Sequence, residues 1–236
     1  MKPPIYEPKG KAKEYGDLAL NIYTGCPHRC YYCFAPGVLH KEKEQFHSHV
    51  EPRPGIVEEV RKQLEKEHIT GKLIHLCFTC DPYPTGYDST ATMEIIQLLK
   101  KHGNHVQILT KGDGRRDFDL LDSGDWYGVT ISCGKIMADE AEPGAISPLT
   151  RIDALKEAKK RGIKTWVSFE PVIDPGAVIG CIVNYFDLFD KVKVGKLNYH
   201  PLEINWGEFG QMVENTLKET GVDYYIKDSL RAEMNK

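Results

Sequence analysis

The chain is organised around the stretch Gly25-Cys26-Pro27-His28-Arg29-Cys30-Tyr31-Tyr32-Cys33, which follows an apolar, strand-like run at residues 18–23. Its three cysteines have the spacing C-x3-C-x2-C. Three thiolates can each hold one iron of a [4Fe–4S] cube, which leaves the fourth iron without a protein ligand and open to chemistry. Zinc is the alternative, but a zinc site usually has a fourth protein ligand, and His28 and His40 fit no familiar Cys/His spacing. We therefore predict that Cys26, Cys30 and Cys33 bind a [4Fe–4S] cluster.

This motif, with Tyr32 just before its last cysteine, resembles the cluster motif of the radical S-adenosylmethionine (radical SAM) enzymes. Residues 25–28, followed by Phe34-Ala35-Pro36, are similar more narrowly to the branch that contains spore photoproduct lyase. The resemblance implies that S-adenosylmethionine (SAM) chelates the fourth iron. One electron from the cluster then cleaves SAM to methionine and a 5′-deoxyadenosyl radical, which abstracts hydrogen from a substrate. An electron donor such as flavodoxin or ferredoxin is implied as a partner.

Composition places the chain among ordinary soluble proteins and does not identify the substrate. Its 236 residues fit one domain, and a net charge of −3 with a pI near 6.3 gives no global basic field. A nucleic acid therefore stays an option as substrate, beside a nucleotide or small metabolite, without support from charge. Seven cysteines without a recognisable signal peptide, and no apolar run of about 20 residues, predict a cytoplasmic protein that does not span a membrane.

Apolar runs alternate with segments of helical periodicity after an irregular arm at residues 1–17. Strands are predicted at residues 18–24, 73–78, 106–110, 127–132, 165–169 and 191–194, with a last short one at 224–226. Helices are predicted near residues 56–64, 90–102, 118–121, 152–158, 178–185 and 209–217, and an extended loop at 38–54. Alternation of this kind demands parallel strands with right-handed crossovers. It leaves open a doubly wound sheet or a barrel, but the resemblance implies an α/β fold, a partial (β/α)6 TIM-type barrel, over residues 18–236.

In either fold, functional residues gather after the carboxyl ends of the strands. Thr79 and Asp81 follow the second strand, and Lys111 follows the third. The resemblance implies that Thr79 and Asp81 contact the amino group of SAM and that Lys111 pairs with its carboxylate. Turn formation at Asp81-Pro82 and a solvated lysine are the structural alternatives.

Four more candidates belong to the later strands and to the cysteine loop. The resemblance implies that Ser132 binds the ribose or methionine portion of SAM. By the same resemblance, Arg151 reaches the carboxylate and Glu142 orients Arg151 or the ribose; an ordinary helix-face ion pair is the alternative for Arg151. Glu170 follows the fifth strand, and substrate binding, ribose binding and a structural salt bridge all stay open for it. Tyr32 is expected to pack near the adenine.

Two cysteines outside the motif, Cys77 and Cys80, form a C-x2-C pair at the second strand. Spore photoproduct lyase uses a cysteine in this neighbourhood as a hydrogen donor, so Cys80 and Cys77 are candidates for that role, although Phe78 aligns nearer to the donor position. A second metal site built from Cys77, Cys80, Cys133 and Cys181 is disfavoured. Two other functions are weighed against the radical SAM enzyme: a non-catalytic iron–sulfur or zinc module, and a DNA photoproduct lyase.

Overall fold

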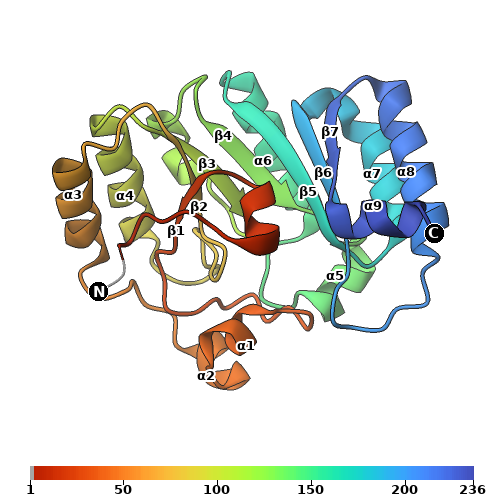
Figure 1. The fold of residues 1–236 in the computed structure, drawn as a ribbon, viewed down its shortest axis with the longest axis horizontal. Helices are drawn as coiled ribbons and strands as arrows, with labels where there is room; N and C mark the ends of the chain where they lie inside the picture. The colour runs from red at the N-terminus through yellow and green to blue at the C-terminus, as the bar shows by residue number, and fades with distance from the viewer. Residues whose placement is uncertain (1–2) are drawn as a thin grey trace.

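The structure is a computed structural model that describes residues 3–236, and it contains one sheet of seven parallel strands. The strands pair strictly in chain order, which is the pattern of a (β/α) barrel, and no pairing between the first and the seventh strand is seen in the described residues. The sheet is therefore curved but open, and the predicted partial TIM-type barrel is confirmed (Figure 1). The strands are β1 (Leu18–Leu20), β2 (Leu73–Leu76), β3 (His105–Thr110), β4 (Trp126–Thr130), β5 (Lys164–Val172), β6 (Lys191–Lys196) and β7 (Asp223–Ile226).

Helices cover the convex face of the sheet (Figure 1). Side chains alternate along each strand, so Ile74 and Leu76 point toward the helices with zero exposure, whereas His75 points to the concave face. The principal helices are α3 (Ile56–Glu67), α4 (Thr90–Lys101), α6 (Pro148–Lys160), α7 (Pro175–Tyr185) and α8 (Trp206–Thr220). None of the helices described between residues 3 and 236 is long and apolar enough to cross a membrane.

Helix α6 illustrates how local sequence sets the ends of an element. Ser147 is its N-cap and accepts a hydrogen bond from the backbone N–H of Thr150, and Pro148 occupies the first turn, where a missing N–H costs nothing. The chain leaves the helix at Gly162, whose φ of +75° is a conformation that glycine adopts without strain.

The expectation of an extended loop at residues 38–54 is wrong. The chain forms two short helices here, α1 (Ala35–Leu39) and α2 (Lys43–Ser48). Phe46 in α2 is 1% exposed, and its carbonyl oxygen accepts a hydrogen bond from the N–H of Cys26 (3.2 Å). The polar composition of the segment gave no sign of this contact, because Phe46 is the one aromatic side chain buried there. The other short helices are η1 (Gly10–Glu14), η2 (Arg115–Leu120), α5 (Lys135–Ala141), η3 (Phe186–Leu188) and α9 (Asp228–Met234).

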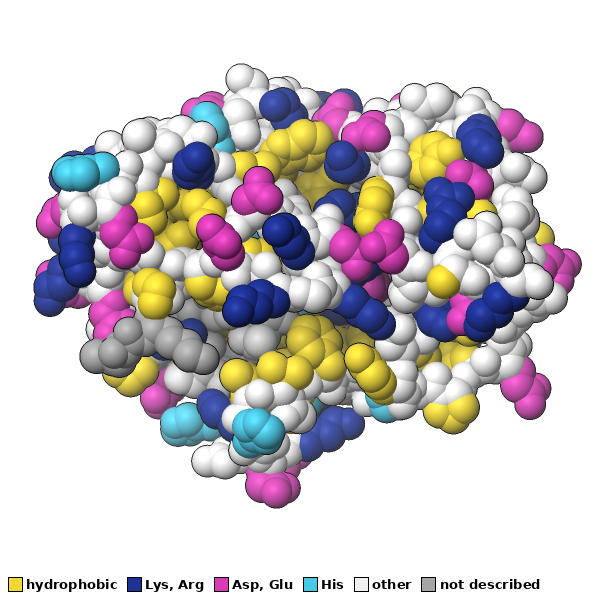
Figure 2. Space-filling model, viewed as in Figure 1, with side chains coloured by type: hydrophobic (Ala, Val, Ile, Leu, Met, Phe, Trp, Pro, Cys, Tyr) yellow, Lys and Arg dark blue, Asp and Glu magenta, His cyan; other side chains and the backbone are white. Residues whose placement is uncertain are grey.

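The amino-terminal arm crosses the concave face of the sheet (Figure 1). Its residues 1–2 lie outside the described part of the chain. Tyr6 pairs with Ala19 in an antiparallel bridge, and η1 then lies in front of the central strands. In the same view, Figure 2 shows basic and acidic side chains side by side across the middle of this face, with hydrophobic side chains above them. The predicted arm is thus a packed part of the barrel interior.

Candidate functional site

The cysteine loop follows β1 and is held by close backbone contacts on two sides. A Cβ atom on Gly25 would lie 2.2 Å from the carbonyl oxygen of Phe46, and one on Gly144 would lie 2.1 Å from that of Pro27. Both distances are far below any real carbon–oxygen contact, so only glycine allows these approaches. The loop is therefore clamped between α2 and the segment that joins α5 to α6.

Of the three cysteines of this loop, Cys30 is buried and Cys26 and Cys33 are half-buried. Burial raises the pKa of Cys26, and the negative charge of the neighbouring Asp81 adds to the rise. Burial also raises the pKa of Cys30 to about 11, although the nearby Lys111 ammonium opposes it. Thiols of this kind stay protonated until a cation replaces the proton, which is the behaviour of metal ligands.

The spacing of the thiols differs from that of a single-ion site. In a tetrahedral zinc site with Zn–S bonds of about 2.3 Å, the sulfur atoms stand roughly 3.8 Å apart. Within residues 3–236, only His105, Asp122 and Asp125 bring three ligand atoms within 4.8 Å of one another, and there Lys100 already binds both carboxylates at 2.6 Å. Within the described residues, at least one pair of the three sulfur atoms therefore stands more than 4.8 Å apart, farther than two ligands of one zinc ion.

Asp81 joins the ends of β2 and β3. Its Oδ1 accepts hydrogen bonds from the backbone N–H of Tyr83 (2.8 Å) and the hydroxyl of Thr110 (2.5 Å), and its Oδ2 accepts one from the N–H of Lys111 (2.9 Å). The Nδ1 atom of His28, in the cysteine loop, lies 3.4 Å from the same Oδ2. Because both oxygens are engaged, Asp81 positions the loops around the site.

A second network joins the cysteine loop to β4 and α6. The Tyr32 hydroxyl contacts Ser132 Oγ (3.0 Å) and donates to Glu142, whose Oε2 pairs with a guanidinium nitrogen of Arg151 at 2.6 Å. Burial alone would raise the pKa of Glu142, but Lys111 and Arg151 outweigh it and hold this pKa below its usual value. The carboxylate is therefore ionised, and it orients both Tyr32 and Arg151.

The two cations near Glu142 differ in what remains free on them. Arg151 is 1% exposed, and its other nitrogens donate to the carbonyls of Ile146 (2.9 Å) and Thr130 (2.8 Å). Lys111 Nζ lies 4.0 Å from Glu142 and, among the described residues, makes no hydrogen bond. Burial lowers the pKa of Lys111, but Cys30 and Glu142 raise it by more, so it stays protonated. Lys111 is thus the cation that can accept an external carboxylate.

Three further candidates lie at the same end of the sheet or beside it. The backbone N–H of Thr79 donates to Asn21 Oδ1 (2.9 Å). The Thr79 side chain is half-buried, and its hydroxyl makes no hydrogen bond among the described residues. Cys77 is buried with φ of +71°, and Cys80 Sγ accepts from the N–H of Tyr23 at 3.4 Å.

Glu170 faces the concave interior instead of the cysteine loop. It accepts a hydrogen bond from the Tyr15 hydroxyl and pairs with Lys227 at 2.7 Å. Sequence reasoning missed Tyr15 and Lys227, which lie in an irregular arm and beyond the last strand. The alternation of polar residues along β5 and β6 was the one signal that could have indicated a polar interior.

Comparisons with known proteins identify the class that this barrel and its cysteine loop define. Residues 20–189 match the family model of the radical SAM superfamily, and the chain belongs to that superfamily, whose members are enzymes that use SAM and an iron–sulfur cluster. An uncharacterized protein of Methanocaldococcus jannaschii is 28% identical over 96% of this chain and 88% of its own length. An uncharacterized protein of Acidianus two-tailed virus is 27% identical over 75% of this chain and 66% of its own length.

Solved structures extend the likeness in fold to the spore photoproduct lyase branch. Spore photoproduct lyase complexed with a dinucleoside spore photoproduct has a TM-score of 0.70 at 12% identity and covers 93% of this chain and 79% of its own. Streptococcus suis SuiB bound to S-adenosylmethionine has a TM-score of 0.63 at 10% identity, covering 88% and 46%. Identities this low establish a common fold, and the substrates of those proteins stay their own.

Proposed function

We propose that Cys26, Cys30 and Cys33 hold a [4Fe–4S] cluster and that the chain uses it to cleave SAM reductively and abstract hydrogen from a substrate. The observation that carries this proposal is the meeting of three thiols, one buried and two half-buried, with the Lys111 ammonium, whose carboxylate partner Glu142 stands 4.0 Å away, at the carboxyl ends of the strands. This donor set fits both groups, because three thiolates leave one iron open and Lys111 can neutralise a carboxylate.

The cluster and SAM supply a one-electron cleavage that yields methionine and a 5′-deoxyadenosyl radical. Around them, Lys111 binds the cofactor carboxylate, and the free hydroxyl of Thr79 accepts from its amino group. Ser132 and Tyr32 face the ribose and adenine. The Glu142 carboxylate holds Tyr32 in place by accepting a hydrogen bond from the Tyr32 hydroxyl. Asp81 and Arg151 act through other residues, since their polar atoms are engaged within the chain. They are positioning residues.

The remaining roles follow from the same proposal. A small electron carrier such as flavodoxin or ferredoxin reduces the cluster, and the reducing cytoplasm protects it. Cys80 and Cys77 are the thiols available for hydrogen donation, and burial raises the pKa of Cys77 well above its usual value, which keeps that S–H intact. The substrate stays open at this level.

Anaerobic reconstitution with iron and sulfide tests the proposal. We expect about four irons per chain and, after reduction with SAM present, methionine and 5′-deoxyadenosine in equal amounts. Cys30→Ala is the control for the cluster, and Cys181→Ala, a thiol outside the loop, is the matched control that keeps both properties. Zinc in place of iron, or product no greater than with Cys30→Ala, would refute the proposal. Iron and SAM binding without cleavage would instead support a non-catalytic sensor.

A further inference from the structure

The side chain of Tyr15 fills the centre of the barrel. Its ring lies against the concave face of the sheet, where the ammonium groups of Lys193 and Lys227 stand 4.4 and 4.5 Å from the ring centroid. Its hydroxyl contacts Ser168 Oγ (3.1 Å) and donates to Glu170. The chain thus places a planar ring, with its donor group on a carboxylate, against the concave face of the sheet.

The wall around this ring contains two polar groups that make no hydrogen bond to Tyr15. His75 is 1% exposed, and neither of its ring nitrogens has a hydrogen-bond partner in the described part of the chain. Lys193 is 5% exposed, donates only to the backbone carbonyl of Glu14 (2.5 Å), and has no carboxylate oxygen within 4.0 Å among residues 3–236. An unpaired buried charge and an unpartnered buried imidazole are both costly for a fold. Their presence together points to a ligand.

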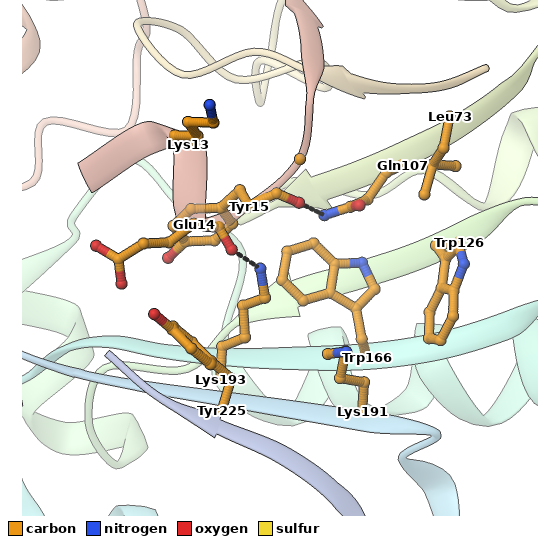
Figure 3. A pocket seen from close by; sticks show the side chains of 11 residues that line it. Lys13, Glu14, Tyr15, Leu73, Gln107, Trp126, Trp166, Lys191, Lys193 and Tyr225 are labelled. Atoms are coloured by element: carbon orange, nitrogen blue, oxygen red, sulfur yellow. Dashed lines mark hydrogen bonds between the residues drawn. The ribbon is translucent and has the colours of Figure 1, made fainter. Parts of the chain in front are cut away.

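A cavity of about 360 Å³ adjoins the ring on the side of the amino ends of the strands. Figure 3 shows Lys193 pointing toward Tyr15 and Trp166 lying between Lys193 and Trp126. Lys191 also lines this space, while Gln107 donates to the Tyr15 carbonyl at 3.2 Å. Indole rings and ammonium groups in one cavity suit a flat molecule that carries negative charge.

The Tyr15 position also lies next to the proposed cofactor site. The backbone N–H of Ile131 donates to the carbonyl of Ser168 (3.0 Å), so Ser132 follows directly at the level above Ser168. Ser132 in turn contacts Tyr32 of the cysteine loop at 3.0 Å. Ser168 pairs with Thr130 in the register of β4 and β5, and parallel strands rise about 3.3 Å per residue, so Ser132 lies two residues' rise beyond the Ser168 hydroxyl that Tyr15 contacts.

We propose that Tyr15 occupies the place of the substrate ring, and that the substrate is a planar ring carrying a hydrogen-bond donor and joined to a negatively charged group. This inference rests on the proposed function. Glu170 and Ser168 bind the donor, Lys193 neutralises the charge, and His75 binds a further polar atom. The arm formed by residues 10–16 withdraws when the substrate enters. Glu170 and Lys193 then determine specificity.

Binding of small probes to the reconstituted protein tests this inference. The probes are 4-hydroxyphenylacetate and uridine 5′-monophosphate, which carry the same features on a phenol and on a nucleobase, and toluene, which carries neither. In Tyr15→Gly we expect at least one charged probe to quench tryptophan fluorescence with a Kd at least tenfold lower than in the wild type, and tighter than toluene. The probe that binds shows whether the site takes a phenol ring or a nucleobase. Tyr87→Gly, an exposed tyrosine elsewhere, should match the wild type.

Two further measurements keep the test decisive. Lys193→Met added to Tyr15→Gly should abolish the preference over toluene. In the wild type, which needs no cavity-forming change, a saturating charged probe should speed hydrogen exchange of the amides at residues 10–16 at least tenfold. Binding of toluene alone, or unchanged exchange in that segment, would overturn the inference. SAM cleavage assayed in the same samples keeps the two proposals separate, because cleavage without charged-probe binding refutes only this one.

Discussion

The buried pair of Glu142 and Arg151 allows a quantitative test of how the site is held together. Arg151→Met would leave the Glu142 carboxylate buried, with the Tyr32 hydroxyl and an ammonium 4.0 Å away as its remaining partners. Breaking one side of a buried ion pair costs about 3–5 kcal/mol of unfolding free energy. Within that total, the lost hydrogen bonds to the carbonyls of Ile146 and Thr130 account for about 1 kcal/mol each. Urea denaturation should show a midpoint lowered accordingly with an unchanged slope.

A double-mutant cycle isolates the charge part of this cost. In the Glu142→Gln background no carboxylate remains to be stranded, so Arg151→Met should cost only about 2 kcal/mol, the share of the two carbonyls. Arg161→Met is the matched control at the end of the same helix: its partners Asp119 and Glu157 are exposed, and such pairs contribute about 1 kcal/mol or less. Equal costs for Arg151→Met in both backgrounds, or a cost no larger than that of Arg161→Met, would refute the reasoning.

Three other predictions follow from single residues. Lys111→Met should raise the Kd for SAM about 10- to 100-fold, measured by equilibrium dialysis on the reconstituted protein, because a charge-assisted bond is worth about 1.5–3 kcal/mol; an unchanged Kd contradicts this role. Gly144→Ala should lower iron content per chain, because its Cβ would meet Pro27, whereas Gly180→Ala, which meets nothing within 4 Å, should not; equal iron contents would exclude the clamp. In the wild type, the free energy of unfolding should fall by about 1.4 kcal/mol for each pH unit between 6.5 and 3 because of His75. This contribution should be absent from His75→Phe, and parallel profiles of unfolding free energy against pH would contradict the prediction.

The sign of the His75 effect follows from its surroundings. Burial, with the charge of Lys193 as a second cause, lowers the pKa of His75 to about 3, and the unfolded chain titrates near 6.5. Between these values the unfolded state binds the proton and the folded state does not, so stability rises with pH across this window. The groups that face His75 are the Tyr15, Phe78 and Trp166 rings and the Lys193 ammonium, and none of them accepts its proton.

Much of the fold could be predicted from the sequence because its main signals are local. Alternating apolar runs and helical periodicity placed all seven strands, with β1 and β2 ending earlier than expected, since Asn21 and Cys77 turn the chain toward the site. The helix within residues 38–54 was not predicted because it is held by long-range contacts with the cysteine loop. The Phe46 carbonyl accepts from the N–H of Cys26, and a ring nitrogen of His47 contacts the Cys26 carbonyl at 2.8 Å.

The residues of the candidate site could be located by the rule that function gathers at strand ends, but their roles could not. Arg151 and Lys111 are equivalent cations in the sequence, and only packing distinguishes a guanidinium whose donors are engaged from an ammonium that is free. The role of Tyr15 was out of reach for a different reason. An irregular arm carries no periodicity that would indicate which face of a sheet it covers.

The contrast between paired and unpaired buried groups connects the two ends of the barrel. Both carboxylate oxygens of Asp81 accept hydrogen bonds within the chain, and Glu142 and Arg151 form an ion pair at 2.6 Å, so these three side chains hold loops in position. Among the described residues, Lys111 has only a 4.0 Å ion pair with Glu142, and Lys193 has a backbone carbonyl and the face of Tyr15 but no carboxylate within 4.0 Å. A buried charge without a carboxylate partner costs stability in a protein whose net stability is small. On the substrate proposal made above, that cost is offset when a charged ligand replaces the amino-terminal arm in the interior of the barrel.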